Sequence, residues 1–330
     1  MKPTTVKLCA GAGIAAALAP LAAGFTLQRR ATRRDDEKYP GIGERVDVGG
    51  YRLHVHTAGL DNEGPTVLFE AGMSCSLEVW AWVQDEIARD TPTVSYDRAG
   101  LGRSDRGPRP RTAEDMRAEL DQVLEAAGTK GPYVLVAHSF GGLLVRKFAH
   151  DHPDRVAGMV LVDSSHPEQM VRSARQALGL PLMRSTIQNA VLLAAVGINR
   201  LSDRYIVSGV EHLPERVREA ACARMLAHRT WKTTLQELRG WLDTVNDEVR
   251  DTTLPADLPL AVVTADVPNR ADPVHDELQD ELAALSANSK RLVVPDSDHL
   301  GLVMKERFAK YVTEAVADVV RAARTGRPLD

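Results

Sequence analysis

Short, largely apolar runs alternate with longer amphipathic stretches along most of the chain. The runs lie at residues 66–69, 93–96, 133–137, 156–162, 260–264 and 291–294. Apolar runs this short are typical of strands that are buried on both faces. Stretches between and after them, such as residues 112–127 and 302–324, repeat their apolar positions with the period of a helix. The alternation predicts an α/β fold with a mostly parallel central sheet flanked by helices.

The segment before the first buried run has a different pattern. Residues 44–48 and 51–57 alternate apolar and polar positions on either side of Gly49-Gly50, which predicts a β-hairpin. Residues 29–43 are first highly charged and then contain proline and glycine. We expect this stretch to be a linker.

Residues 166–258 interrupt the alternation of strands and helices. They contain no convincing strand pattern, whereas residues 215–228 and 230–244 have helical periodicity. We therefore expect a helical cap, residues 166–258, inserted between strands 6 and 7. The core would comprise residues 36–165 and 259–330, and residues 1–35 would form a separate N-terminal segment.

Residues 8–27 carry no charged side chain. Lysines precede them and arginines follow them, at positions 2, 7, 29, 30, 33 and 34. About 20 apolar residues can span a bilayer, and the arginines favour a retained membrane anchor. Alternatively, Ala22-Ala23-Gly24 is a cleavage site that ends a signal peptide, or the segment is a helix packed on the domain. The expected location is membrane-anchored through residues 8–27, or secreted if they are cleaved.

Composition excludes several classes of protein. The net charge is −4, so the chain has no excess of basic residues. We therefore expect no nucleic-acid partner. Three cysteines without a Cys-x-x-Cys spacing indicate neither a disulfide framework nor a metal site. We expect no metal and no organic cofactor.

The chemistry is concentrated in the turn Ala137-His-Ser139-Phe-Gly141-Gly142. This turn joins a predicted strand to a predicted helix, and a turn this sharp lifts Ser139 above the edge of the sheet. A serine becomes a nucleophile when a base, an orienting carboxylate and backbone N–H donors surround it. The N-terminus of the following helix adds a positive potential at the same place.

This turn and the loops around it resemble the α/β-hydrolase superfamily, in particular the cap-bearing branch that includes many esterases. The family turn is Gly-x-Ser-x-Gly, and here alanine occupies the first glycine position. Residues 97–105 resemble the loop after the family's fourth strand, and the resemblance extends over residues 44–324. Glu70-Ala-Gly-Met73 stands where the family usually has His-Gly. The resemblance implies an oxyanion hole made by the backbone N–H groups of Met73 and Phe140.

The same resemblance implies a base and an acid for Ser139. His299 follows the last predicted strand, as the family's histidine does. The family most often places the acid after the strand at 260–264, where Asp266 follows, and in a minority after the strand at 156–162, which Asp163 ends. We favour Asp163, because Asp266 comes early for the usual loop, and we keep Asp266 as the alternative acid.

These residues predict a serine hydrolase that cleaves a small or apolar carboxylic ester through an acyl-enzyme. A serine at the turn argues against epoxide hydrolases and haloalkane dehalogenases, which use aspartate there. Leucines, methionines, Trp231 and Trp241 in the cap indicate either an apolar substrate pocket or simply the core of the cap. An aminopeptidase or amidase, an acyltransferase, and a catalytically silent binding protein on this fold remain alternatives.

Overall fold

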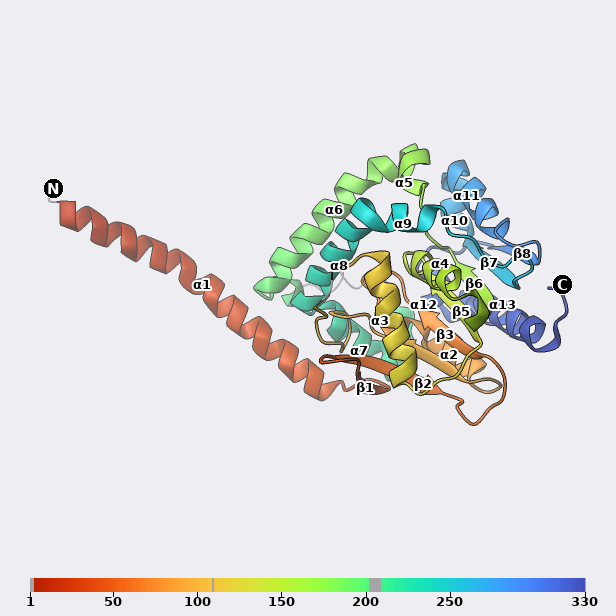
Figure 1. The fold of residues 1–330 in the computed structure, drawn as a ribbon. Coiled ribbons are helices and arrows are strands. Elements are labelled where there is room, and N and C mark those ends of the chain that lie inside the picture. Colours follow the sequence, from red (N-terminus) through yellow and green to blue (C-terminus); the bar gives the residue numbers. More distant parts are fainter. Residues whose placement is uncertain (1–2, 109, 202–208, 330) are drawn as a thin grey trace.

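A single eight-stranded sheet forms the centre of the molecule. The computed structural model describes residues 3–108, 110–201 and 209–329 (Figure 1). The strands are β1 (Glu44–Asp47), β2 (Arg52–Ala58), β3 (Thr66–Glu70), β4 (Thr93–Tyr96), β5 (Tyr133–His138), β6 (Val156–Val162), β7 (Leu260–Ala265) and β8 (Ser289–Val294). Their order is β1-β2-β4-β3-β5-β6-β7-β8. The strands from β4 to β8 are all parallel, and β2 runs antiparallel to β1 and β4. The predicted fold class is confirmed.

The sheet is covered by helices on both faces. The helices of the core are α2 (Ala81–Ile87), α3 (Ala113–Ala126), α4 (Gly141–Asp151), α10 (Asp266–Ala271), α11 (Pro273–Ala283), α12 (Gly301–Met304) and α13 (Glu306–Thr325), with the short 3₁₀ turns η1 (Leu77–Trp80) and η2 (Pro153–Arg155). α2, α12 and α13 pack with Val134 and Val136 on one face, and α3, α4 and α11 pack with Leu135 and Ala137 on the other. Every residue of β3, β5 and β7 is buried. Apolar side chains are therefore needed on both faces, and these strands read as continuous runs.

The predicted hairpin is present at the edge of the sheet. Val46 pairs with Leu53, and the turn between the strands contains Gly49 and Gly50. Both glycines have φ close to +100° (98° and 99°), a conformation that side chains with a Cβ rarely adopt.

The segment between β6 and β7 is helical, and its described residues contain no strand. It comprises α5 (Gln169–Arg172), α6 (Ala174–Ala195), α7 (Glu215–Met225), α8 (His228–Gly240) and α9 (Asn246–Arg250), with the 3₁₀ turns η3 (Ile198–Leu201) and η5 (Val210–His212) and a π-helical turn at Trp241–Val245. The helices arch over one side of the sheet (Figure 1). We refer to residues 166–258 as the cap.

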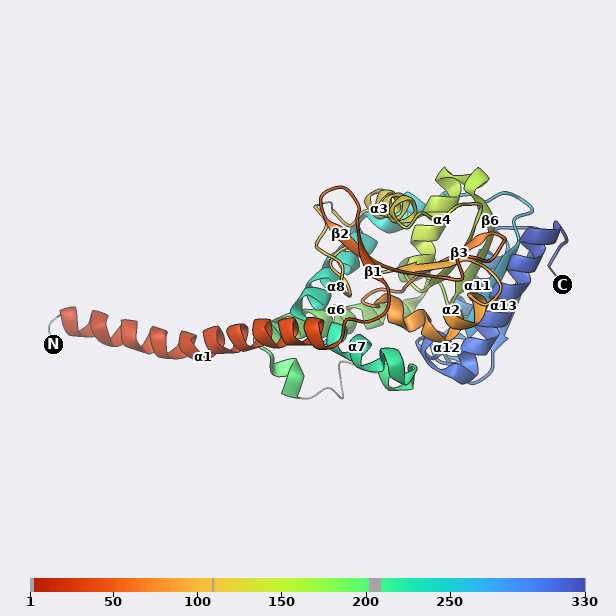
Figure 2. The ribbon, with the colours of Figure 1, turned by 90° about the horizontal axis from the view of Figure 1, so that it is seen from below.

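Helix α1 (Pro3–Lys38) leads away from the domain at its N-terminal end (Figure 2). The prediction of a linker from residue 29 is wrong, because the helix continues to Lys38. It ends just before Pro40, since a residue that precedes proline disfavours the helical conformation. The cap stabilises this extension. The Gln28 amide donates to the Leu226 carbonyl (2.9 Å), and Asp36 accepts from Arg229 (2.7 Å).

Across the described part of the chain, no helix combines the length with the mean hydropathy needed to cross a bilayer.

Candidate active site

Ser139 lies at the turn between β5 and α4, at the carboxyl end of the sheet. Its φ of 54° is in the left-handed region, a strained conformation for a residue with a side chain. The Ser139 N–H donates to the Val162 carbonyl (3.1 Å), and the Ser139 carbonyl accepts from the Ser165 N–H (3.0 Å). A Cβ at Gly142 would lie 1.7 Å from the Ser164 Oγ. Glycine is therefore required beside the nucleophile.

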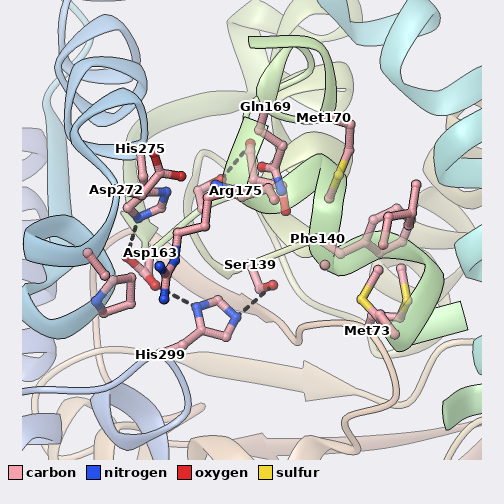
Figure 3. Close-up of a pocket in the computed structure, with 18 of the residues that line it drawn as sticks. Met73, Ser139, Phe140, Asp163, Gln169, Met170, Arg175, Asp272, His275 and His299 are labelled. Atoms are coloured by element: carbon pink, nitrogen blue, oxygen red, sulfur yellow. Dashed lines mark hydrogen bonds and ion pairs between the residues drawn. The ribbon is translucent and has the colours of Figure 1, made fainter. Parts of the chain in front are cut away.

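His299 contacts both Ser139 and Asp163. Its Nε2 lies 3.0 Å from the Ser139 Oγ, and its Nδ1 lies 2.5 Å from the Asp163 Oδ2 (Figure 3). With Nδ1 protonated and donating to the carboxylate, Nε2 is free to accept the serine proton. The structure therefore brings together the three residues that the sequence singled out as nucleophile, base and favoured acid.

Asp163 directly follows β6, has a φ of 40° and is almost fully buried. Its Oδ1 accepts the Ala265 N–H (3.0 Å) and lies 3.2 Å from the His275 Nε2. Burial alone would raise the pKa of this carboxyl, but the hydrogen bonds of His275 and His299 outweigh burial and hold the pKa well below its usual value. The group is a carboxylate at neutral pH.

The alternative acid, Asp266, lies elsewhere. Helix α10 begins at Asp266 directly after β7, so there is no loop to carry this carboxylate to His299. Its Oδ2 instead accepts the Asp296 N–H (2.9 Å) and pairs with Arg270 (3.0 Å).

The two oxyanion donors inferred from the resemblance, Met73 and Phe140, line the same cavity as Ser139. The loop that carries Met73 approaches the nucleophile closely: a Cβ on Gly72 would lie 3.3 Å from the Ser139 Cβ. Among the described residues, no protein group accepts a hydrogen bond from the N–H of Met73 or Phe140. Both N–H groups are therefore available to an oxyanion.

Arg98 binds the segment Glu70-Ala-Gly-Met73, which stands where the family usually has His-Gly. The buried Arg98 guanidinium donates to the Glu70 carboxylate (2.5 Å) and to the carbonyls of Ala71 (2.6 Å) and Gly72 (2.9 Å). It also makes two hydrogen bonds to Glu237 of cap helix α8, at 2.8 and 3.0 Å. An arginine thus fixes the oxyanion loop and links it to the cap. The one sequence signal was an acidic residue at the end of a buried strand, which requires a partner.

Two further histidines surround the triad, and sequence reasoning missed both. The ring of His138 lies against the His299 ring, with centroids 4.5 Å apart. Its Nε2 is 3.0 Å from the His299 carbonyl. Burial lowers the pKa of His138 to about 3, so it is a neutral donor. His275 contacts Asp163 from helix α11, and its helical pattern carried no signal of this role.

A cavity of about 590 Å³ opens above Ser139. Its apolar wall contains Met73, Phe140, Met170, Leu180, Met183 and Trp241, and its polar wall contains Gln169, Arg175, Gln176, Asp272 and His275. Trp241 therefore faces the cavity. Trp231 belongs instead to the core of the cap, where its Nε1 donates to the Met225 carbonyl (2.7 Å).

One group of possible metal ligands lies within the described residues, namely His166, Glu168 and Glu281. Arg172 already pairs with Glu168 (3.3 Å) and Glu281 (2.7 Å). The Arg172 guanidinium therefore offsets one of the two carboxylate charges of this group.

Comparison with known proteins agrees with this fold. Residues 65–184 match the family described as alpha/beta hydrolase fold. The structure is similar to the Cif epoxide hydrolase from Acinetobacter nosocomialis (TM-score 0.68, 16% identity, covering 90% of this chain and 96% of that one). It is also similar to a thermophilic esterase from Thermogutta terrifontis (TM-score 0.61, 19% identity, 86% and 100%). The match to the family model thus covers about a third of the chain, and the solved structures share its fold.

A curated relative covers only part of the chain. Protein YqjL of Bacillus subtilis is 37% identical over 117 residues, which are 35% of this chain and 46% of YqjL. The chain thus spans about half the length of this relative.

Proposed function

We propose that the protein is a serine hydrolase that cleaves a carboxylic ester with a small or apolar acyl group through an acyl-enzyme intermediate. The observation that carries this proposal is the continuous hydrogen-bonded path from the Ser139 Oγ through His299 to the buried Asp163. The nucleophile at its end opens onto a cavity with an apolar wall.

In acylation, the Ser139 oxygen attacks the ester carbonyl while His299 Nε2 takes the hydroxyl proton. The carbonyl oxygen becomes an oxyanion that the N–H groups of Met73 and Phe140 stabilise. Each such donor contributes about 10²–10³-fold in rate when correctly aimed. The intermediate collapses as the bond to the leaving alcohol breaks, and His299 returns the proton to that oxygen.

In deacylation, a water molecule takes the place of the alcohol. His299 accepts a proton from the water as it attacks the acyl carbon, and the proton then goes to the Ser139 oxygen as the acid leaves. Asp163 stays ionised throughout and stabilises the imidazolium that forms twice in each cycle.

The apolar wall supports an apolar acyl group. Met73 and Phe140 lie beside Ser139, and the cap adds Met170, Met183 and Trp241. Methionine side chains adapt to irregular shapes, so this wall suits acyl groups of several lengths.

The test is covalent labelling of the full chain with a fluorophosphonate probe, together with turnover of p-nitrophenyl esters of increasing acyl length. Ser139→Ala and His299→Ala versions are compared with Ser165→Ala, whose serine lines the same cavity but does not contact His299. We expect labelling and turnover in the parent and in Ser165→Ala, and neither in the other two.

Other outcomes favour the alternatives. Labelling with turnover of amides or aminoacyl amides faster than esters supports an amidase or aminopeptidase. Formation of a new ester when an alcohol is added supports an acyltransferase. A folded parent that neither reacts with the probe nor cleaves any ester contradicts the proposal and supports a binding protein.

We also propose that residues 8–27 contact a membrane, and that they anchor the protein unless they are cleaved as a signal peptide. The charge pattern supports this, because arginines 29, 30, 33 and 34 directly follow an uncharged segment. Fractionation of cells that express the full chain, followed by a high-pH wash and N-terminal sequencing, separates a retained anchor from a secreted and cleaved product.

A further inference from the structure

The cavity above Ser139 has two chemically different sides. Figure 3 shows Met73, Met170 and Phe140 on one side of Ser139 and Asp163, Asp272 and His275 on the other. The apolar side suits a hydrocarbon group, as the proposed function requires.

Arg175 extends into this polar side from the first turn of helix α6 (Figure 3). Of the described residues that line the cavity, Arg175 is the one lysine or arginine. The N-terminal end of α6, whose partial charge is positive, lies at the same wall, because Gln176 also lines the cavity.

No carboxylate among the described residues lies within 4.0 Å of the Arg175 guanidinium nitrogens, although two carboxylates line the cavity. Both have other partners. Asp163 is bound by His275, His299 and the Ala265 N–H. Asp272, which is buried, accepts a hydrogen bond from the Ser173 hydroxyl. Arg175, which is exposed and has no carboxylate partner in the described part of the chain, is therefore free to pair with an anionic group that enters this side.

We propose that the ester substrate carries a carboxylate group that binds Arg175, on the side of the scissile bond opposite the apolar wall. This proposal rests on the proposed function and names its substrate class: an ester that is apolar at one end and anionic at the other. A guanidinium matches a carboxylate with two parallel hydrogen bonds. An uncharged amide of the same shape lacks the charge attraction to the guanidinium and can accept only one of the two hydrogen bonds.

The test uses ester pairs that differ only in this charge. One pair carries it on the alcohol part, as 4-carboxyphenyl butyrate and 4-carbamoylphenyl butyrate. The other carries it on the acyl part, as monophenyl succinate and phenyl succinamate. In the parent we expect kcat/KM for the anionic member of one pair to exceed that of its neutral partner by about tenfold or more.

Substitution then assigns the preference to one residue. Arg175→Gln should remove the preference by lowering kcat/KM of the anionic ester toward that of its neutral partner, and Arg175→Lys should keep part of the preference. Arg184→Gln is the matched control, because Arg184 lies on α6 but does not line the cavity. A parent without preference in either pair, or a preference that survives Arg175→Gln, overturns the inference.

Equilibrium binding separates this inference from the proposed function. The Ser139→Ala protein, which lacks the nucleophile, is titrated with both esters of each pair. The same titrations are made with the Ser139→Ala protein that also carries Arg175→Gln. Tighter binding of an anionic member that Arg175→Gln abolishes supports the anion site even if the parent cleaves no ester. Equal binding of both members overturns it even if neutral esters are cleaved.

Discussion

Arg98 joins Glu237 of the cap to the loop that carries Met73. The two side chains make two hydrogen bonds (2.8 and 3.0 Å), and both are almost fully buried. The same guanidinium donates to the carbonyl of Gly72, one residue before the inferred oxyanion donor. The position of the oxyanion loop therefore depends on a residue that belongs to the cap.

Glu237→Gln tests this dependence. The change leaves Arg98 and Arg111 with one carboxylate fewer in a buried site, so we expect the free energy of unfolding to fall by about 3 kcal/mol or more. The looser loop should also lower kcat more than it raises KM. Urea unfolding and ester kinetics measure both. Asp85→Asn, which breaks the exposed pair with Arg216, should cost less than about 1 kcal/mol. Equal effects of the two changes would contradict the argument.

Kinetics of two variants decide whether Asp163 or Asp266 is the acid of the triad. Asp163→Asn removes the charge that orients His299 and stabilises its protonated form, so kcat should fall on the order of 10³–10⁴-fold. Asp266→Asn affects only the start of α10, and kcat should stay within about threefold of the parent. Near-equal losses, or a larger loss for Asp266→Asn, would exclude Asp163 as the acid.

His275 should act as a positioning residue for Asp163. It lies 3.2 Å from the Asp163 Oδ1, and a donor there reduces the negative charge that His299 experiences. His275→Leu removes the donor and so increases the negative charge beside His299. The acid limb of the pH profile of kcat/KM should therefore move to higher pH. His275→Gln retains an N–H donor and should leave the limb near its original position. An identical limb in all three proteins would assign His275 a purely structural role.

His138 makes stability depend on pH. Burial lowers its pKa from 6.5 to about 3, so below pH 6.5 the unfolded chain binds a proton that the folded protein does not. The free energy of unfolding should therefore fall as the pH drops from about 6.5 toward 3, by up to about 1.4 kcal/mol per pH unit from this group. In His138→Gln, which keeps a donor for the His299 carbonyl, the fall should be smaller.

Urea unfolding at pH 7 and pH 5 measures the difference. His212→Gln changes an exposed histidine and serves as the control. If His138→Gln and the parent lose the same stability between these two pH values, the buried ring does not contribute as described.

The sequence predicted the sheet, the cap insertion and the place of Ser139 because each rests on local pattern. Buried strands read as apolar runs, and the turn at 137–142 has its own signature. Arg98, His138 and His275 were missed for a physical reason: each acts through a partner distant in sequence. Arg98 meets Glu237, 139 residues away, and His275 meets Asp163, 112 residues away. The periodic pattern of apolar and polar residues contains no information about such distant contacts.

The linker was predicted wrongly for a similar reason. The charges of residues 29–38 suggested a solvated stretch, but Asp35 and Asp36 bind Arg200, Arg224 and Arg229 of the cap. Tertiary ion pairs thus extend a helix that local composition would end.

Those ion pairs have a mechanical consequence. The hydrogen bonds and ion pairs that the side chains of Gln28, Asp35 and Asp36 make are with residues of the cap. A load applied to the start of the chain would thus be borne by the cap, whose Arg175 and Met183 line the cavity, while Ser139, Asp163 and His299 stay on the core. The contacts of α1 thus connect the start of the chain to the cap side of the substrate pocket and not to the triad.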